Sequence, residues 1–112
     1  MGYMRHHCIV VTSWNEKLLE EAHTVAKEFF QVTPNPGFPD KKISEITPSS
    51  INGYASFLIA PDGSKEGWNT SDKGNEARDN FIAWIKSKLS IDWVEIQYGD
   101  DERETKITRH SR

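Results

Sequence analysis

The sequence predicts an α+β fold, a ferredoxin-like split βαβ sandwich in which two helices pack on one antiparallel sheet. Residues 7–12 and 54–60 are apolar runs rich in β-branched or aromatic residues, which indicates two buried strands. Each run is followed by apolar residues at helical spacing, and each helix pattern is followed by a segment of mixed polarity. The resulting order of strand, helix, strand, strand, helix and strand is that of the ferredoxin-like motif.

The first helix is expected directly after residues 7–12. Ser13 and Glu16 have the spacing of a capping box, in which both side chains bond free N–H groups of the first helical turn. Apolar residues then recur at helical spacing up to the end of the helix: Leu18, Ala22, Val25, Ala26, Phe29 and Phe30. Prolines at positions 34, 36 and 39 follow and predict an irregular loop.

The middle of the chain predicts a hairpin. Residues 43–47 are mixed in polarity and stop at Pro48, so we expect them to form a strand at an edge of the sheet. Asn52 and Gly53 both tolerate positive φ, which suits a tight turn into the next strand. That strand, residues 54–60, is expected to be central.

The last third of the chain predicts a helix and two strands. Residues 77–89 have an apolar helical stripe, and residues 105–109 predict a short extra strand within a tail that is expected to be mobile from about residue 103. Residues 93–98 alternate as a half-buried edge strand does, with Val94, Ile96 and Tyr98 against Trp93, Glu95 and Gln97.

Right-handed crossovers then give the strand order 93–98, 7–12, 54–60, 43–47 across the sheet. This order places the two most apolar strands in the centre and the mixed strands at the edges, in agreement with their composition. An open α/β sheet of another strand order is the alternative.

Length and composition limit the function classes. The 112 residues fit a single domain over 1–112, and 36% hydrophobic residues with four Trp are typical of a folded chain. A net charge of −3 lacks the basic surplus of general DNA-binding proteins. The lone Cys8 excludes an internal disulfide, and no apolar run is long enough to cross a membrane. We therefore expect a cytoplasmic protein without membrane association or a cofactor.

The two central strands are apolar on both faces, although the expected fold covers one face with helices. An uncovered apolar face of that size usually marks a partner surface. We therefore predict a homodimer or higher oligomer through the sheet face, or a ligand bound on the sheet. The alternative is that the extra strand and the tails fold over this face. The alternating pairs are Cys8 and Val10 against Ile9 and Val11, and Tyr54 and Leu58 against Phe57 and Ile59.

The loop before the second helix is the predicted ligand site. A helix N-terminus preceded by Gly, Ser and Lys suits an anion, because free N–H groups and the helix dipole both favour negative charge. An aromatic residue in the loop offers a stacking surface for a base. An ordinary capped loop is the competing interpretation. The predicted contacts are Ser64, Lys65, Trp68, Asn69, Thr70 and Ser71, with Trp14 at the start of the first helix as a further contact residue.

No convincing catalytic or metal-binding motif is present. His6 and Cys8 share one face of a strand and His7 points to the other, so one ion could not use all three. Ser64 lacks the G-x-S-x-G frame of a hydrolase nucleophile. A small hydrolase or transferase acting on a phosphorylated or nucleotide substrate is kept as the alternative function, and it would use His6, His7, Asp62 and Asp100.

The segments HHCIVVTSW, NGYASFLIAPDGSKEGW and WVEIQYGDD resemble small uncharacterised proteins of tailed bacteriophages. The resemblance covers most of the chain and implies an origin, with no catalytic residues to transfer. We therefore expect a non-enzymatic binding module, a phage accessory protein that binds a host protein or sequesters a small anionic or nucleotide ligand in the host cytoplasm. An oligomeric structural component without a ligand is the third hypothesis.

Overall fold

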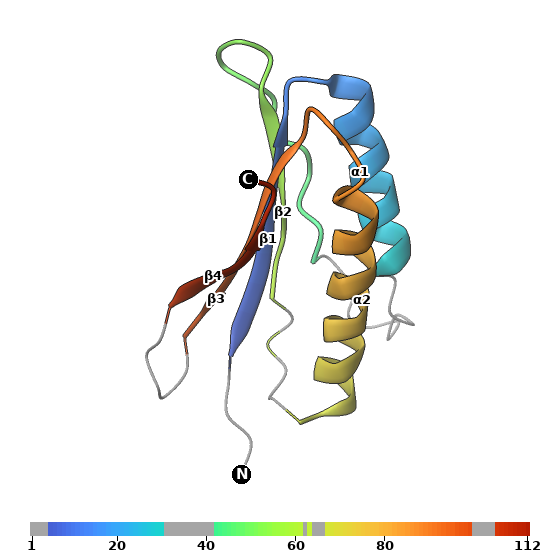
Figure 1. Ribbon diagram of the computed structural model, residues 1–112, viewed down its shortest axis with the longest axis vertical. Coiled ribbons are helices and arrows are strands. Elements are labelled where there is room, and N and C mark those ends of the chain that lie inside the picture. The colour runs from blue at the N-terminus through green and yellow to red at the C-terminus, as the bar shows by residue number, and fades with distance from the viewer. Residues whose placement is uncertain (1–4, 31–41, 62, 64–66, 100–104) are drawn as a thin grey trace.

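The computed structural model describes residues 5–30, 42–61, 63, 67–99 and 105–112, and this part of the chain has an α+β fold. Two helices lie side by side on one face of a four-stranded antiparallel sheet (Figure 1). Neither described helix is long and apolar enough to cross a membrane. The elements are β1 (His6–Ser13), α1 (Glu16–Phe29), β2 (Ala55–Ile59), α2 (Asn69–Ile85), β3 (Asp92–Tyr98) and β4 (Lys106–His110).

The strand order is β2-β1-β3-β4. β1 lies between β2 and β3, and Ile9 of β1 is aligned with Ile59 of β2 and with Glu95 of β3. Because side chains alternate along a strand, these three residues share one face of the sheet. All three are buried, so this is the face that the helices cover.

The expectation of a continuous edge strand at residues 43–47 was wrong. Ile43 and Thr47 form isolated bridges with β2, and no continuous strand connects them. Ser44 explains part of the interruption, because its hydroxyl accepts a hydrogen bond from the Leu58 amide at 2.8 Å in place of a backbone carbonyl. β2 is therefore the outermost regular strand on its side of the sheet, and the expectation of a central strand at 54–60 was wrong in this respect.

The expected edge strand at residues 93–98 is also corrected, because β3 is an interior strand between β1 and β4. β4 corresponds to the short extra strand expected at 105–109. The turn at Asn52 and Gly53 is confirmed, since their φ angles are 63° and 74°.

The start of α1 differs from the predicted capping box. Asn15 is the N-cap, and its side-chain oxygen accepts a hydrogen bond from the Leu18 amide at 3.1 Å. Ser13 is instead the buried last residue of β1, and its hydroxyl donates to the Ser90 carbonyl at 2.6 Å. Asn15 is as good a cap as Ser. The hydrogen bond from Ser13 to Ser90 connects the end of β1 to the segment between α2 and β3. The helix therefore starts after Asn15.

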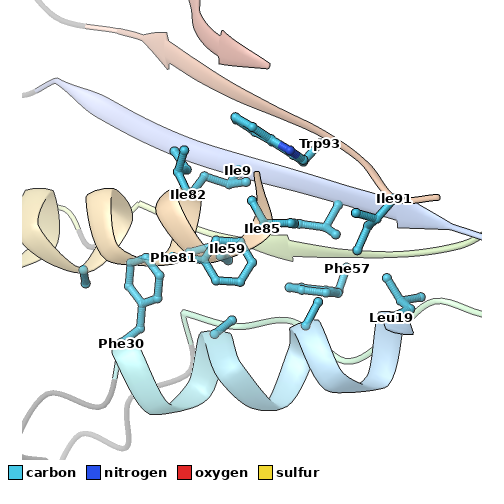
Figure 2. Packing of buried hydrophobic residues seen from close by; sticks show 14 residues of the cluster. Ile9, Leu19, Phe30, Phe57, Ile59, Phe81, Ile82, Ile85, Ile91 and Trp93 are labelled. Carbon is cyan, nitrogen blue, oxygen red and sulfur yellow. The ribbon is translucent and has the colours of Figure 1, made fainter. Parts of the chain in front are cut away.

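The core fills the space between the sheet and both helices (Figure 2). Phe81 of α2 is fully buried, and its ring lies 6.5 Å from the ring of Phe30 and 6.1 Å from that of Trp84. Ile59 of the sheet belongs to the same cluster (Figure 2). Phe81 therefore joins α1, α2 and the sheet in one cluster.

Replacing Phe81 by Ala tests this packing. We expect Phe81→Ala to lower the free energy of unfolding by about 3–5 kcal/mol, because it leaves a cavity between three elements. Leu89→Ala is the matched control, since Leu89 is 86% exposed and should change stability by less than about 0.5 kcal/mol. Urea denaturation measures both values, and equal small losses in the two variants would contradict the described core.

Candidate functional site

A polar cleft of about 470 Å³ lies between α2, β3 and β4. The side chains around it come from β1, the middle of α2 and the two strands at the C-terminal side of the sheet. Every lining residue within the described part of the chain is polar or charged, in contrast to the apolar core beside it. They are His7, Asn75, Arg78, Asp79, Glu95, Thr108 and Arg109.

Glu95 is the central residue of this cleft. It is 3% exposed, and its carboxylate accepts two hydrogen bonds from Arg109, from Nε and from Nη2, each at 2.8 Å. The Thr108 hydroxyl donates to the same carboxylate at 2.7 Å, and the Nε of Arg78 lies 3.8 Å from it. The buried negative charge is therefore balanced by donors from both α2 and β4.

A β-bulge brings two neighbouring residues of β4 to this carboxylate. In a regular strand, Thr108 and Arg109 would point to opposite faces of the sheet. The register between β3 and β4 shifts at Glu95 and Ile96, which is the signature of a bulge. Both side chains consequently reach Glu95 from the same strand.

Electrostatics keep Glu95 ionised. Burial alone would raise the pKa of its carboxyl group, but hydrogen bonds from Arg109 and Thr108 and the charges of Arg109 and Arg78 outweigh burial. The pKa of Glu95 is therefore below its usual value of 4.5. A carboxylate with a lowered pKa is a poor proton donor and a weak base at neutral pH, so this cluster suits binding better than acid–base catalysis.

Arg109 connects the cleft to its mouth. Its Nη1 donates to the Asp79 carboxylate at 2.9 Å, while its other edge holds Glu95. These contacts raise the pKa of Arg109 above its usual value, and the hydrogen bond to Glu95 makes the largest contribution. The Asp79 side chain is 65% exposed and that of Arg109 is 38% exposed, so this ion pair is largely in solvent. Arg78 lies deeper in the cleft and donates to the Asn75 side chain.

The predicted ligand loop is described in part. Ser64 and Lys65 lie outside the described residues, as does the side chain of Thr70. Asn69 is exposed in the first turn of α2, and Ser71 is buried.

The two tryptophans of the predicted site are both exposed but are not brought together. Trp68 is the N-cap residue of α2, and Trp14 stands between the end of β1 and the start of α1. These element ends lie at opposite ends of the molecule (Figure 1), so the two aromatic rings cannot share a small ligand.

The other face of the sheet is apolar. Val10 of β1 is aligned with Leu58 of β2 and Val94 of β3, and Ile96 is aligned with Ile107 of β4. Both helices lie on the opposite side (Figure 1), and no other described element covers this face. We call it the open face, and its apolar side chains are Cys8, Val10, Leu58, Val94, Ile96, Tyr98 and Ile107.

Residues of the alternative catalytic site are dispersed. His6 is on the open face, where its ring centroid lies 5.2 Å from that of Tyr98, whereas His7 lines the cleft on the covered face. Burial, with a smaller contribution from Glu95, raises the pKa of the Cys8 thiol, so the thiol is protonated and weakly nucleophilic. Asp62 and Asp100 lie outside the described residues. No three His, Cys, Asp or Glu residues of the described segments could hold a metal ion together.

Sequence reasoning missed Arg78, Glu95 and Arg109 as a cluster. One signal was present, because Glu95 and Gln97 share a strand face with Trp93, a residue type that is usually well buried. A carboxylate on such a face requires a charged partner. The sequence did not indicate that the partner would come from the basic residues of the C-terminal tail.

Replacing Glu95 by Gln tests the buried charge. We expect Glu95→Gln to lower the free energy of unfolding at pH 7 by roughly 2–3 kcal/mol, less than for a fully buried pair because Arg109 is 38% exposed. The folded-state pKa of Glu95 is lowered, so its stabilisation is fully present above pH 4.5 and is lost as the pH falls through the folded-state pKa. The difference between the two proteins should therefore shrink in acid.

Urea unfolding at a series of pH values measures this difference. Asp92→Asn is the control, because Asp92 is 59% exposed and its ion pair with Arg112 is 3.9 Å long. A constant difference between wild type and Glu95→Gln at all pH values would contradict the assigned role.

Comparisons of the chain with protein-family models, with curated proteins and with solved structures gave no match. The resemblance to phage proteins is not tested by these comparisons and stays a prediction. The described residues form two surfaces that are candidates for binding, the polar cleft and the open face.

Proposed function

We propose that this chain is a non-enzymatic binding module that works as a homodimer through the open face of its sheet. The observation that carries this proposal is the apolar character of that face across all four strands. Ile107 is 62% exposed there, and Leu58 and Tyr98 are also exposed. Contiguous apolar surface of this kind is unfavourable in water and usually marks a contact with another protein chain.

A second copy of the chain suits this surface because its centre carries no charge. The central residues Val10 and Ile96 are aligned with apolar residues on both sides, and Val94 is aligned with Val10 and with His110 of β4. The polar residues Thr12 and Ser56 on this face are paired, since their hydroxyl oxygens are 2.8 Å apart. Two copies with a net charge of −3 each can meet here without like charges facing each other at the centre of the contact.

The chemistry of the described residues favours binding over catalysis. The carboxylate of Glu95 stays ionised and the thiol of Cys8 stays protonated, so neither is prepared for proton transfer or nucleophilic attack. We propose that the chain acts as a phage accessory protein in the host cytoplasm. A host protein would be the occupant of the open face if the chain does not associate with itself.

We also propose that the fold is a ferredoxin-like sandwich extended by β4. Residues 43–47 would take the place of the outer strand in that fold. The antiparallel bridges of Ile43 with Ile59 and of Thr47 with Ser56 support this assignment. Backbone bonds from the Ser44 amide to the Leu58 carbonyl at 2.9 Å, and from the Thr47 amide to the Ser56 carbonyl at 2.7 Å, support it as well.

A charge placed on the open face tests the homodimer. We expect the wild-type protein to be a dimer and Ile107→Lys to raise its dissociation constant at least about tenfold, because two desolvated ammonium groups would enter the contact. Ile107 is 62% exposed in the monomer, so the variant should keep its fold. Sedimentation equilibrium measures the masses, and circular dichroism checks the fold.

Leu89→Lys is the matched control for this experiment. It makes the same change in charge at an apolar residue that is 86% exposed and lies in the connection between α2 and β3, outside the residues that define the open face. Its dissociation constant should equal that of the wild type. A monomeric wild-type protein, or equal effects of the two variants, would rule out self-association through the open face.

A further inference from the structure

We propose that the polar cleft between α2, β3 and β4 binds a small oxyanion, a phosphate or carboxylate group. Its described lining residues lie on the covered side of the sheet, opposite the open face. Its volume of about 470 Å³ is within the range of small-molecule sites, and its lining supplies charged and hydrogen-bonding groups. The inference therefore goes beyond the proposed homodimer and does not depend on it.

The two carboxylates of the cleft are held very differently. Glu95 is 3% exposed and accepts bonds from Thr108 and Arg109, so it is a fixed part of the site. Asp79 is 65% exposed and contacts Nη1 of Arg109 at the mouth. Ion pairs that are this exposed are weak, because water competes for both partners. Asp79 is thus the carboxylate that a ligand can replace.

Glu95 also sets the orientation of the guanidinium groups. It binds the Nε and Nη2 edge of Arg109 and directs Nη1 toward the mouth of the cleft. Arg78 lies on the other side of the same carboxylate, with its Nε 3.8 Å from the Glu95 oxygen. Preorganised guanidinium groups are the usual partners of phosphate and carboxylate ligands, because their N–H groups match two oxygens at once.

Nη1 of Arg109 loses its carboxylate partner when Asp79 turns away. The described lining carries two guanidinium groups, Arg78 and Arg109, and two carboxylates, Glu95 and Asp79. With Asp79 turned away, two guanidinium groups face one carboxylate among the lining residues. An incoming oxyanion would then accept from Nη1 of Arg109 in place of Asp79. Asp79 acts as an internal competitor in this scheme.

Titration of ¹⁵N-labelled full-length protein with inorganic phosphate, at constant ionic strength, tests the site. We expect amide shifts at residues 75–79 and 108–109. Asp79→Asn should lower the dissociation constant for phosphate several-fold, because it removes the competitor. Glu76→Gln is the matched control, since Glu76 is exposed on α2, makes the same change in charge and does not line the cleft. It should leave the dissociation constant nearly unchanged.

Acetate serves as the second probe and separates phosphate-selective from general oxyanion binding, both of which agree with the proposal. Shifts confined to residues 67–72 would place the anion at the start of α2 and overturn the cleft assignment. Equal changes of the phosphate dissociation constant in Asp79→Asn and Glu76→Gln would show that only the long-range effect of charge is measured. This result would also overturn the cleft assignment. The absence of shifts with either anion in wild type and Asp79→Asn would have the same consequence.

Discussion

The buried carboxylate of Glu95 is the constraint on which the C-terminal half of the fold depends. An ionised group in a folded interior is tolerated when charged partners and hydrogen bonds replace water. Here those partners are three residues from two elements: Arg78 on α2, and Thr108 and Arg109 on β4. Because Arg109 also bonds Asp79 of α2, one guanidinium group connects both elements to β3. The β-bulge in the β3–β4 pair is the backbone adjustment that makes this arrangement feasible.

Glu95 also explains the uneven distribution of polarity over the sheet. The covered face is apolar under Phe81 and Ile85 but polar at Glu95 and Gln97, where the cleft begins. The opposite face of the same strand carries Val94 and Ile96. β3 therefore presents an apolar surface to a protein partner and a charged one to a small ligand. The two proposed binding surfaces are separated by the thickness of one sheet.

Much of the fold was predictable from local patterns. The apolar runs located β1 and β2, the helical stripes located α1 and the second half of α2, and Asn52 with Gly53 located the turn. The error at the start of α1 arose because two neighbouring residues could both cap the helix. Ser13 and Asn15 are both good cap residues, and the hydrogen bond from Ser13 to Ser90 decided between them.

The candidate site was predictable to a lesser degree. The alternation along residues 93–98 separates two faces of the strand but does not indicate which face is buried. In the structure the buried face is the one that contains Glu95. That result depends on Thr108 and Arg109, which reach Glu95 through a bulge that no local pattern in the sequence indicates. The homodimer and the anionic ligand remain predictions, since they concern molecules outside this chain.

Amide hydrogen exchange of β4 tests the central role of Glu95 most directly. Wild-type and Glu95→Gln proteins would be compared residue by residue at a pH where the wild-type carboxylate is ionised. We expect the variant to lose protection at the β4 amides that pair with β3, and at Ser111, whose amide bonds the Trp93 carbonyl at 2.9 Å. Protection in α1 should stay, because α1 packs on β1, β2 and α2 and has no contact with β3. Unchanged protection throughout β4 would show that backbone pairing alone holds the strand, and would contradict the role assigned to the buried carboxylate.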